Sequence, residues 1–425
     1  MKKVLKWVGI AILTPILLFI LLTILIYLPP VQNWAVKKVA AYASEETGMN
    51  ITVERVKLVF PLDLGIDGVL ATEPNDSLKN VTDTVLDARS IVVDVRLLPL
   101  FSGNVEIDAL ELNSIKLNTK EKVPDLRIRG SMERLYAASH GIDLGAETVR
   151  LDEAEIMGAL VDVALGDSVP PDTTESETRW KINVEDLRVV RSDVTVHMPG
   201  DSMQVQAYMD KAQATGGRFD LLKGEYVVGK FDWNDGRLNY DLNYEKTVDG
   251  LDVNHIALTN VNVGIDSLYY CDPELRLNIR QLAFKEKSGI EVSELTGPVR
   301  LDSAKIYLPA MRLRTPNSYL DADFVMDMNT FDDKNPGEMH LKADGKIGKQ
   351  DIMLFLGDLP EKFKREYPNQ PMTVKAVMAG NMKHVDITGL YASLPTAFTI
   401  KSNGVAERCL LLGGNVVTFF GQHCA

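Results

Sequence analysis

The sequence predicts a mainly β protein: an N-terminal transmembrane helix, then a long antiparallel sheet of curved strands with few, short helices. Three observations predict it. They are an uncharged run near the N-terminus, period-two alternation of apolar and polar residues after Gly48, and a recurring irregularity in that alternation. The 425 residues correspond to about three domains or to one elongated unit.

The composition is that of a folded protein, with 45% hydrophobic and 25% charged residues. A mean hydropathy of -0.04 excludes a protein with many membrane spans. Lys and Arg number 46 against 59 Asp and Glu, which leaves a net charge of -13 and no visible basic patch. Three unevenly placed cysteines exclude a disulfide framework. Because the chain is acidic and shows no basic patch, we expect no nucleic-acid partner.

Residues 1–30 are expected to form a cytoplasmic tip and a transmembrane anchor. The uncharged stretch from Trp7 to Leu28, written as a helix, spans about 33 Å, which matches a bilayer core. Its end residues Trp7 and Tyr27 suit the membrane interfaces, and three lysines before it favour a cytoplasmic N-terminus. A cleaved signal peptide is the alternative, but its apolar region should be shorter. The rest of the chain is then expected outside the cytoplasm.

The segment 31–48 is expected to be an amphipathic helix, running from Val31 to Thr47 and ending at Gly48 as its C-cap. Two roles stay open for it. It caps the next domain of the chain, or it rests on the membrane surface and orients that domain. Its apolar face is formed by Val31, Ala35, Val39 and Tyr42.

A specific pattern recurs in the strands, with apolar residues at offsets 0, 2, 5 and 7, as in Ile182, Val184, Leu187 and Val189. The odd step would turn the apolar set to the other face of a regular strand. One inserted residue, a β-bulge, restores the face and bends the strand. Polar pairs occupy the step at Asp152-Glu153, Glu185-Asp186, Asn254-His255 and Asp302-Ser303. The copies begin at Ile51, Val105, Val149, Ile182, Leu251 and Val299.

Residues 49–404 are therefore expected to form curved antiparallel strands with one apolar and one solvated face. Either a closed sandwich core or an open, curled sheet whose apolar face lines a groove satisfies this pattern. Short helices are expected at Ser131–Ser139 and Asp351–Phe363, and a polar loop at Gly166–Thr178. The residues expected to line the apolar face are Leu110, Leu112, Leu187, Val189, Ile256 and Leu258.

No motif for catalysis, phosphate binding or zinc binding occurs in the sequence. We expect no enzyme activity, no cofactor and no metal site. Asp321 and Asp323 would share a face of a strand, where they could hold a cation or simply form its polar face. His197, His255 and His384 stand alone in strand-like runs and are expected to be solvated or packed rather than catalytic.

Short segments, in their order along the chain, resemble the AsmA-like superfamily, and within it the TamB-like translocation and assembly module proteins. The resemblance is best over residues 1 to about 120. Later segments, Cys271–Leu275 and Lys349–Met353, are similar to Bacteroides-type members. The earlier segments are the anchor, Val31–Trp34, Glu45–Gly48, Ile51–Val53, Phe60–Leu64, Leu97–Gly103 and Val105–Leu117.

The resemblance implies an inner-membrane anchor, a long periplasmic β-groove known as a β-taco, and a role in outer-membrane biogenesis. Members have been linked to phospholipid transport between the membranes and to outer-membrane protein assembly with a barrel partner. Full-length members are much longer and carry a C-terminal domain that nothing in this sequence matches.

Two functions are compatible with these expectations. In the first, the apolar face conducts phospholipid, because a groove would remove most of the roughly 12 kcal/mol that a sixteen-carbon chain faces in water. In the second, an exposed sheet edge receives strands of an outer-membrane barrel protein. Lipid bound in stoichiometric amounts would favour the first, and a captured barrel protein without lipid the second.

The tail, residues 405–425, differs from the rest of the chain. Its only charged residues are Glu407 and Arg408, and it holds Cys409 and Cys424. Its apolar runs lack period-two alternation, and an exposed apolar strand at a chain end is an aggregation risk. We expect a truncated or frame-shifted version of a longer protein. The alternative is a genuine final strand in the open end of the groove.

Overall fold

The computed structural model shows a mainly β chain that divides into two compact units. Unit 1 comprises Met1–Ile142 and Leu151–Ala164, and unit 2 comprises Asp143–Arg150 and Leu165–Ala425. The residues that the structure describes are 29–59, 63–74, 81–95, 107–119, 126–143, 146–165, 179–198, 202–248, 250–332, 334–355, 361–407 and 418–420.

Several expectations lie outside these residues: the transmembrane anchor up to residue 28, the polar loop 166–178 and most of the tail. Of the tail, the structure describes the end of one strand, up to Glu407, and residues 418–420. Within the described part of the chain, no helix is both long and apolar enough to cross a membrane.

Unit 1 begins with helix α2, which confirms the predicted helix and extends it to Pro29–Thr47. Gly48 follows with a φ of +68°, the left-handed conformation that ends a helix. Ser44 fastens α2 to the first strand, since its Oγ accepts the N–H of Ile51 at 3.0 Å and donates to the carbonyl of Ala40 at 2.8 Å. The side chains of the predicted apolar face of this helix lie outside the described ones.

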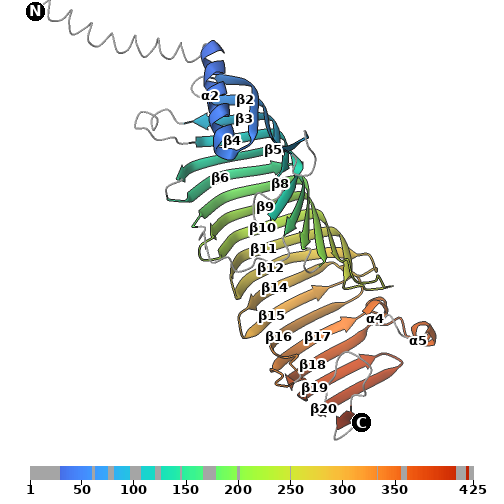
Figure 1. Cartoon of the computed structure of the whole chain (residues 1–425). Helices are drawn as coiled ribbons and strands as arrows, with labels where there is room; N and C mark the ends of the chain where they lie inside the picture. Colours follow the sequence, from blue (N-terminus) through green and yellow to red (C-terminus); the bar gives the residue numbers. More distant parts are fainter. Residues whose placement is uncertain are drawn as a thin grey trace, which may run out of the picture. The chain divides into compact units, whose positions relative to one another are not determined.

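The strands of unit 1 pair antiparallel in sequence order, from β1 to β5 (Figure 1). Val53, Val69, Ala88 and Ile115 lie opposite one another on these strands, and the last three are buried. The strands are β1 (Asn50–Val59), β2 (Asp63–Pro74), β3 (Thr82–Val95), β4 (Ile107–Asn118), β5 (Leu126–Asp143) and β7 (Leu160–Leu165), while β6 (Thr148–Met157) is divided between the units.

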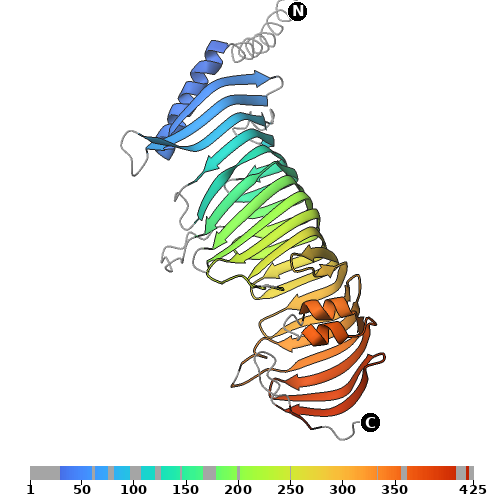
Figure 2. The ribbon, with the colours of Figure 1, turned by 90° about the vertical axis from the view of Figure 1, so that its right-hand side faces the viewer.

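In unit 2, each strand pairs antiparallel with the next, apart from the short β13, past which β12 pairs with β14. Figures 1 and 2 show these strands side by side and curved along their length. The strands are β8 (Lys181–Met198), β9 (Met203–Asp220), β10 (Glu225–Leu242), β11 (His255–Cys271), β12 (Glu274–Glu286), β13 (Glu291–Val292), β14 (Glu294–Leu301), β15 (Lys305–Arg314), β16 (Tyr319–Asp327), β17 (Met339–Ile347), β18 (Met372–Asn381), β19 (His384–Leu394), β20 (Phe398–Glu407) and β21 (Thr418–Phe420).

The helix expected at Asp351–Phe363 is present as two shorter helices, α4 (Lys349–Phe355) and α5 (Glu361–Glu366), between β17 and β18. The residues between them, including Gly357, lie outside the described part. Ile352 of α4 packs with Tyr367 and Leu394 in a small buried core, against which Ile347 and Met372 of the sheet also pack.

The expectation of a helix at Ser131–Ser139 is wrong, because this segment belongs to strand β5. Met132 lies opposite Ile115 of β4, and Leu135 lies opposite Leu112. Pairing with β4 provides partners for the backbone hydrogen-bonding groups and packs alternate side chains. This tertiary contact overrides the local helix propensity of the segment.

Residues with left-handed backbone lie at offset 9 in three copies of the pattern, and not at the predicted step between offsets 2 and 5 of these copies. Ser114, Arg191 and Asn260 have φ values of 50°, 47° and 52°. Each lies inside a strand, between apolar residues of one copy of the pattern, and non-glycine residues adopt this conformation rarely. At Glu185-Asp186 the left-handed residue is instead Gly216, on the facing strand β9.

Two odd steps are turns rather than bulges, contrary to the prediction. Asp302 begins the turn between β14 and β15, and its carboxylate accepts the N–H groups of Ala304 and Lys305, both at 2.9 Å. Asn254 precedes β11 and donates its N–H to Asp252 at 3.1 Å. The fourth pair, Asp152-Glu153, lies inside β6. A polar pair suits a turn as well as a bulge, so the same pattern arises in both cases.

Candidate functional site

The apolar face of strands β8 to β11 is the strongest candidate site in unit 2. Leu187 lies opposite Ala214, which lies opposite Phe231, which lies opposite Ile265. Residues directly opposite in antiparallel strands share a face, so these four form one apolar row across the sheet. A second row runs through Val189, Ala212, Trp233 and Val263.

The other two residues predicted in this unit lie farther along the same strands. Ile256 lies opposite Tyr240, and Leu258 lies opposite Leu238. Asn260 is the inserted residue between Leu258 and Val261, and it keeps both on one face. The four predicted residues of unit 2 therefore share the apolar face, which pure alternation would not allow.

Burial on this face is greatest at the level of the bulges. Ser192 is 0% exposed, Val261 2% and Ala212 3%, although all three are small or medium-sized side chains. Leu187 and Leu258, farther from the bulges, are half-buried. A strand that bends brings its two limbs toward the concave side, which buries the side chains at that level.

No second layer covers this face among the described elements. The substantial contacts of β8 to β11 are with their hydrogen-bonded neighbours. A closed sandwich would pack another sheet onto the apolar face. The described residues therefore favour the curled open sheet over the sandwich, the two forms that the sequence left open.

Trp233 is the largest side chain of this face and lies where the strand bends. Gly236 makes room for it, since a Cβ at Gly236 would come within 2.2 Å of the indole ring. The indole Nε1 is buried and has no hydrogen-bond partner in the described part of the chain. A buried unpaired donor costs free energy, which an acceptor from a bound molecule would recover.

Leu110 and Leu112, the two predicted residues of unit 1, lie on β4. Leu110 lies opposite Val93, and Leu112 lies opposite Ile91 and Leu135. Both leucines are half-buried on the apolar face of this unit.

The opposite face of the strands carries charged side chains. In unit 2, Asp232 accepts hydrogen bonds in ion pairs with Lys230 at 2.8 Å and Arg280 at 2.5 Å. In unit 1, Arg134 lies between Glu111, at 3.2 Å, and Glu155, at 2.7 Å. The hydrogen bond from Arg134 lowers the pKa of Glu111, and the same contact raises the pKa of Arg134.

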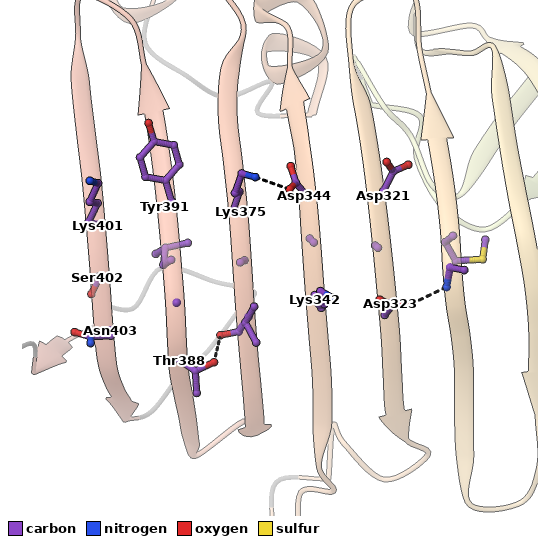
Figure 3. Close-up of a pocket in the computed structure, with 18 of the residues that line it drawn as sticks. Asp321, Asp323, Lys342, Asp344, Lys375, Thr388, Tyr391, Lys401, Ser402 and Asn403 are labelled. Carbon is purple, nitrogen blue, oxygen red and sulfur yellow. Dashed lines mark hydrogen bonds and ion pairs between the residues drawn. The ribbon is translucent and has the colours of Figure 1, made fainter.

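A trough of about 890 Å³ crosses β15 to β20 on this charged face (Figure 3). Asp321 and Asp323 lie along it, with Lys342, Asp344 and Lys375 on the neighbouring strands. Between the two rows of polar side chains, the floor is the backbone at residues whose side chains point to the other face. Ala322, Ala343 and Ala376 are among these floor residues.

Several charged side chains of the trough have partners within the protein. Lys375 donates to Asp344 at 2.7 Å, and this hydrogen bond raises the pKa of Lys375. Asp323 accepts the N–H of Ala310 at 2.8 Å, and Asp321 pairs with an arginine of β15 at 2.8 Å. The two aspartates form the polar face of a strand, and the described residues contain no cluster of three or more metal-ligating side chains.

The histidines lie apart from each other. His255 is buried and contacts Asp252, with 3.1 Å between Nδ1 and Oδ2. His384 lies 3.4 Å from Asp386, and His197 lies in β8. The N–H of Val248 lowers the pKa of Asp252, which keeps this buried carboxylate ionised in its turn. Sequence reasoning missed Asp252, although an Asp two residues before an Asn is a known turn signal.

No protein-family model matches the chain, and no curated protein matches it.

Proposed function

We propose that this chain is an AsmA-like, TamB-like envelope protein that carries phospholipid acyl chains along the apolar face of its sheet. In this proposal residues 1–30 anchor it in the bacterial inner membrane, and the sheet lies in the periplasm. One observation carries the proposal: β8 to β11 present a broad apolar face with half-buried side chains and no described second layer.

The energetic case rests on the acyl chain. Each methylene buried is worth about 0.8 kcal/mol, so an apolar surface that runs along a sixteen-carbon chain offsets about 12 kcal/mol of exposure. The rows at Leu187 and Val189 supply such a surface from one strand to the next, at about 4.8 Å per strand. Transport of this kind needs no catalytic group.

A left-handed residue inside a strand allows apolar side chains on both sides of it to stay on one face of the sheet. In a regular strand Leu187 and Val194, seven residues apart, would point to opposite faces of β8, and the left-handed residue Arg191 lies between them. With it, the apolar side stays apolar, and the strand bends around any molecule that lies on that side.

Photo-crosslinking of the full chain in native membranes tests the proposal. A crosslinker at position 187 should form a phospholipid adduct, and one at the exposed position 185 should not, although both lie on β8. Leu187→Asp should abolish the adduct at position 256 while thermal unfolding changes little. If Leu187→Asp unfolds the protein, a closed core is the better account.

Assembly of outer-membrane barrel proteins is the alternative that the same experiment separates. An adduct at positions 187 and 256 with a barrel protein, and none with lipid, would replace the lipid proposal with a role as an assembly factor.

A further inference from the structure

Helix α2 of unit 1 has two faces with different surroundings. Gln32, Val36, Ala40 and Ser44 succeed one another at four-residue spacing and are all half-buried. Ser44 on this side bonds to the backbone of β1. This side of the helix therefore rests on the sheet.

The other side of α2 is open and carries a large aromatic residue. Trp34 is 64% exposed, and Lys37 and Lys38 are also exposed. Residues three and four apart in a helix lie next to each other, so the indole and the two ammonium groups form one patch. Within the described residues, no ion pair involves either lysine and no hydrogen bond involves the indole of Trp34.

The position of this patch in the chain indicates its contact partner. The uncharged run that the sequence predicts as the membrane anchor ends at Leu28, and α2 begins at Pro29. Trp34 lies five residues after the start of α2, which is about 7.5 Å along a helix axis. The patch is therefore tied close to the lipid headgroups if the anchor spans the bilayer.

We infer that the face of α2 formed by Trp34, Lys37 and Lys38 docks on an anionic phospholipid surface and sets the orientation of the sheet at the membrane. Tryptophan prefers the headgroup region, and lysines near an anionic surface are attracted to it. Ser44 and the half-buried side hold the sheet on the opposite side of the helix. This inference rests on the membrane anchor of the proposed function.

The test uses the full chain reconstituted in vesicles, with the photo-crosslinker p-benzoylphenylalanine at position 34. The matched control carries it at position 331, where Phe331 is similarly exposed, at 69%, in a turn of unit 2. We expect a phospholipid adduct at position 34 in vesicles containing phosphatidylglycerol and much less in vesicles of phosphatidylcholine alone. Position 331 should give little adduct in either.

The second part of the test removes the positive charges of the patch. Each lysine removed should shift the docking equilibrium by about fivefold, so K37Q/K38Q should reduce the adduct strongly. The control pair K287Q/K362Q removes two exposed lysines of unit 2 and should leave it unchanged.

Two results overturn the inference, and they are distinguishable. If the full chain does not float with the vesicles after a high-salt wash, the anchor is wrong and the inference falls with it. If the chain floats but position 34 yields no lipid adduct, or yields a protein adduct instead, the anchor stands and the docking surface is wrong.

Discussion

Two stretches of unit 2 keep an apolar face in different ways. Strands β8, β9 and β10 are each 18 residues long, whereas β15 to β18 have 9 or 10 residues. In the long strands, left-handed residues such as Arg191 and Asp235 bend the chain and preserve the face. In the short stretch, helix α4 packs at the edge of the face.

The difference teaches how an apolar sheet face is protected from water. A long strand bends over its own face, so burial is deepest where small side chains such as Ser192 and Ala212 lie at the bend. The short stretch also contains a left-handed residue, Ala310 of β15, and one of its two described cores is completed by Ile352 from a helix. The most destabilising change should therefore be a side-chain deletion in the short stretch and an added side chain in the long strands.

The largest effect is expected in the core that contains α4. Leu394 is 2% exposed and packs with Ile352 and Tyr367, so L394A should lower the local unfolding free energy by about 2–4 kcal/mol. Hydrogen exchange of β18 and β19 measures it. The control F398A removes a side chain that is 41% exposed on the next strand and should cost far less. Equal losses would contradict the role of the helix.

In the long strands the vulnerable change is an insertion. Ala212 lies at the bend between Val189 and Trp233, so A212L should cost about 1–3 kcal/mol through overpacking. The matched variant A214L adds the same atoms two residues away on the same face, where space is less restricted. Calorimetry should therefore show a larger loss for A212L, and the reverse order would argue against a bend at this level.

The left-handed residue Arg191 predicts which of valine and glycine is the more stable replacement at its position. Valine at position 191 should be less stable than glycine by about 1–2 kcal/mol, because φ there is 47°. Arg188 lies at a regular position of the same strand, where valine should be the more stable of the two. Thermal unfolding of R191V, R191G, R188V and R188G compares the four. The same order at both positions would mean that residue 191 does not need a left-handed backbone.

The smallest effect concerns Glu286, at the end of β12 between the two stretches. Burial alone raises its pKa, but hydrogen bonds from Ser288 and Ala257 outweigh burial and hold the pKa below 4.5. A lowered carboxylate pKa stabilises the fold above the unfolded value, and this contribution is lost as the pH falls through the folded value.

E286Q should therefore be less stable than the parent at neutral pH by about 1 kcal/mol, and the difference should be lost in acid as the pH falls through the lowered pKa of Glu286. Denaturant titrations at several pH values measure it. The exposed Glu294 serves as control, since E294Q should change stability little at either neutral or acid pH. A constant difference across this range would show that the charge of Glu286 contributes nothing.

Much of the local structure can be predicted from the sequence alone. The helix that ends at Gly48 and the one-sided strands are present, because helix caps and apolar periodicity act over a few residues. The expected irregularity of the strands is present, but its left-handed residues, Ser114, Arg191 and Asn260, lie farther along the pattern than the predicted step. Leu187, Val189, Ile256 and Leu258 lie on β8 and β11, each opposite an apolar residue of the neighbouring strand.

Only the tertiary structure decided the features that depend on a partner strand. The polar pair Asp302-Ser303 lies in a turn between two strands, whereas the pair Asp152-Glu153 lies inside β6. The two differ in whether the neighbouring strand continues past the step. The segment Ser131–Ser139 forms a strand because its backbone pairs with β4 and its apolar side chains lie opposite those of β4. The charged trough over β15 to β20 joins residues from six strands, and no local pattern brings them together. Hydrogen bonds between distant segments set such registers, and a single sequence holds no record of their partners.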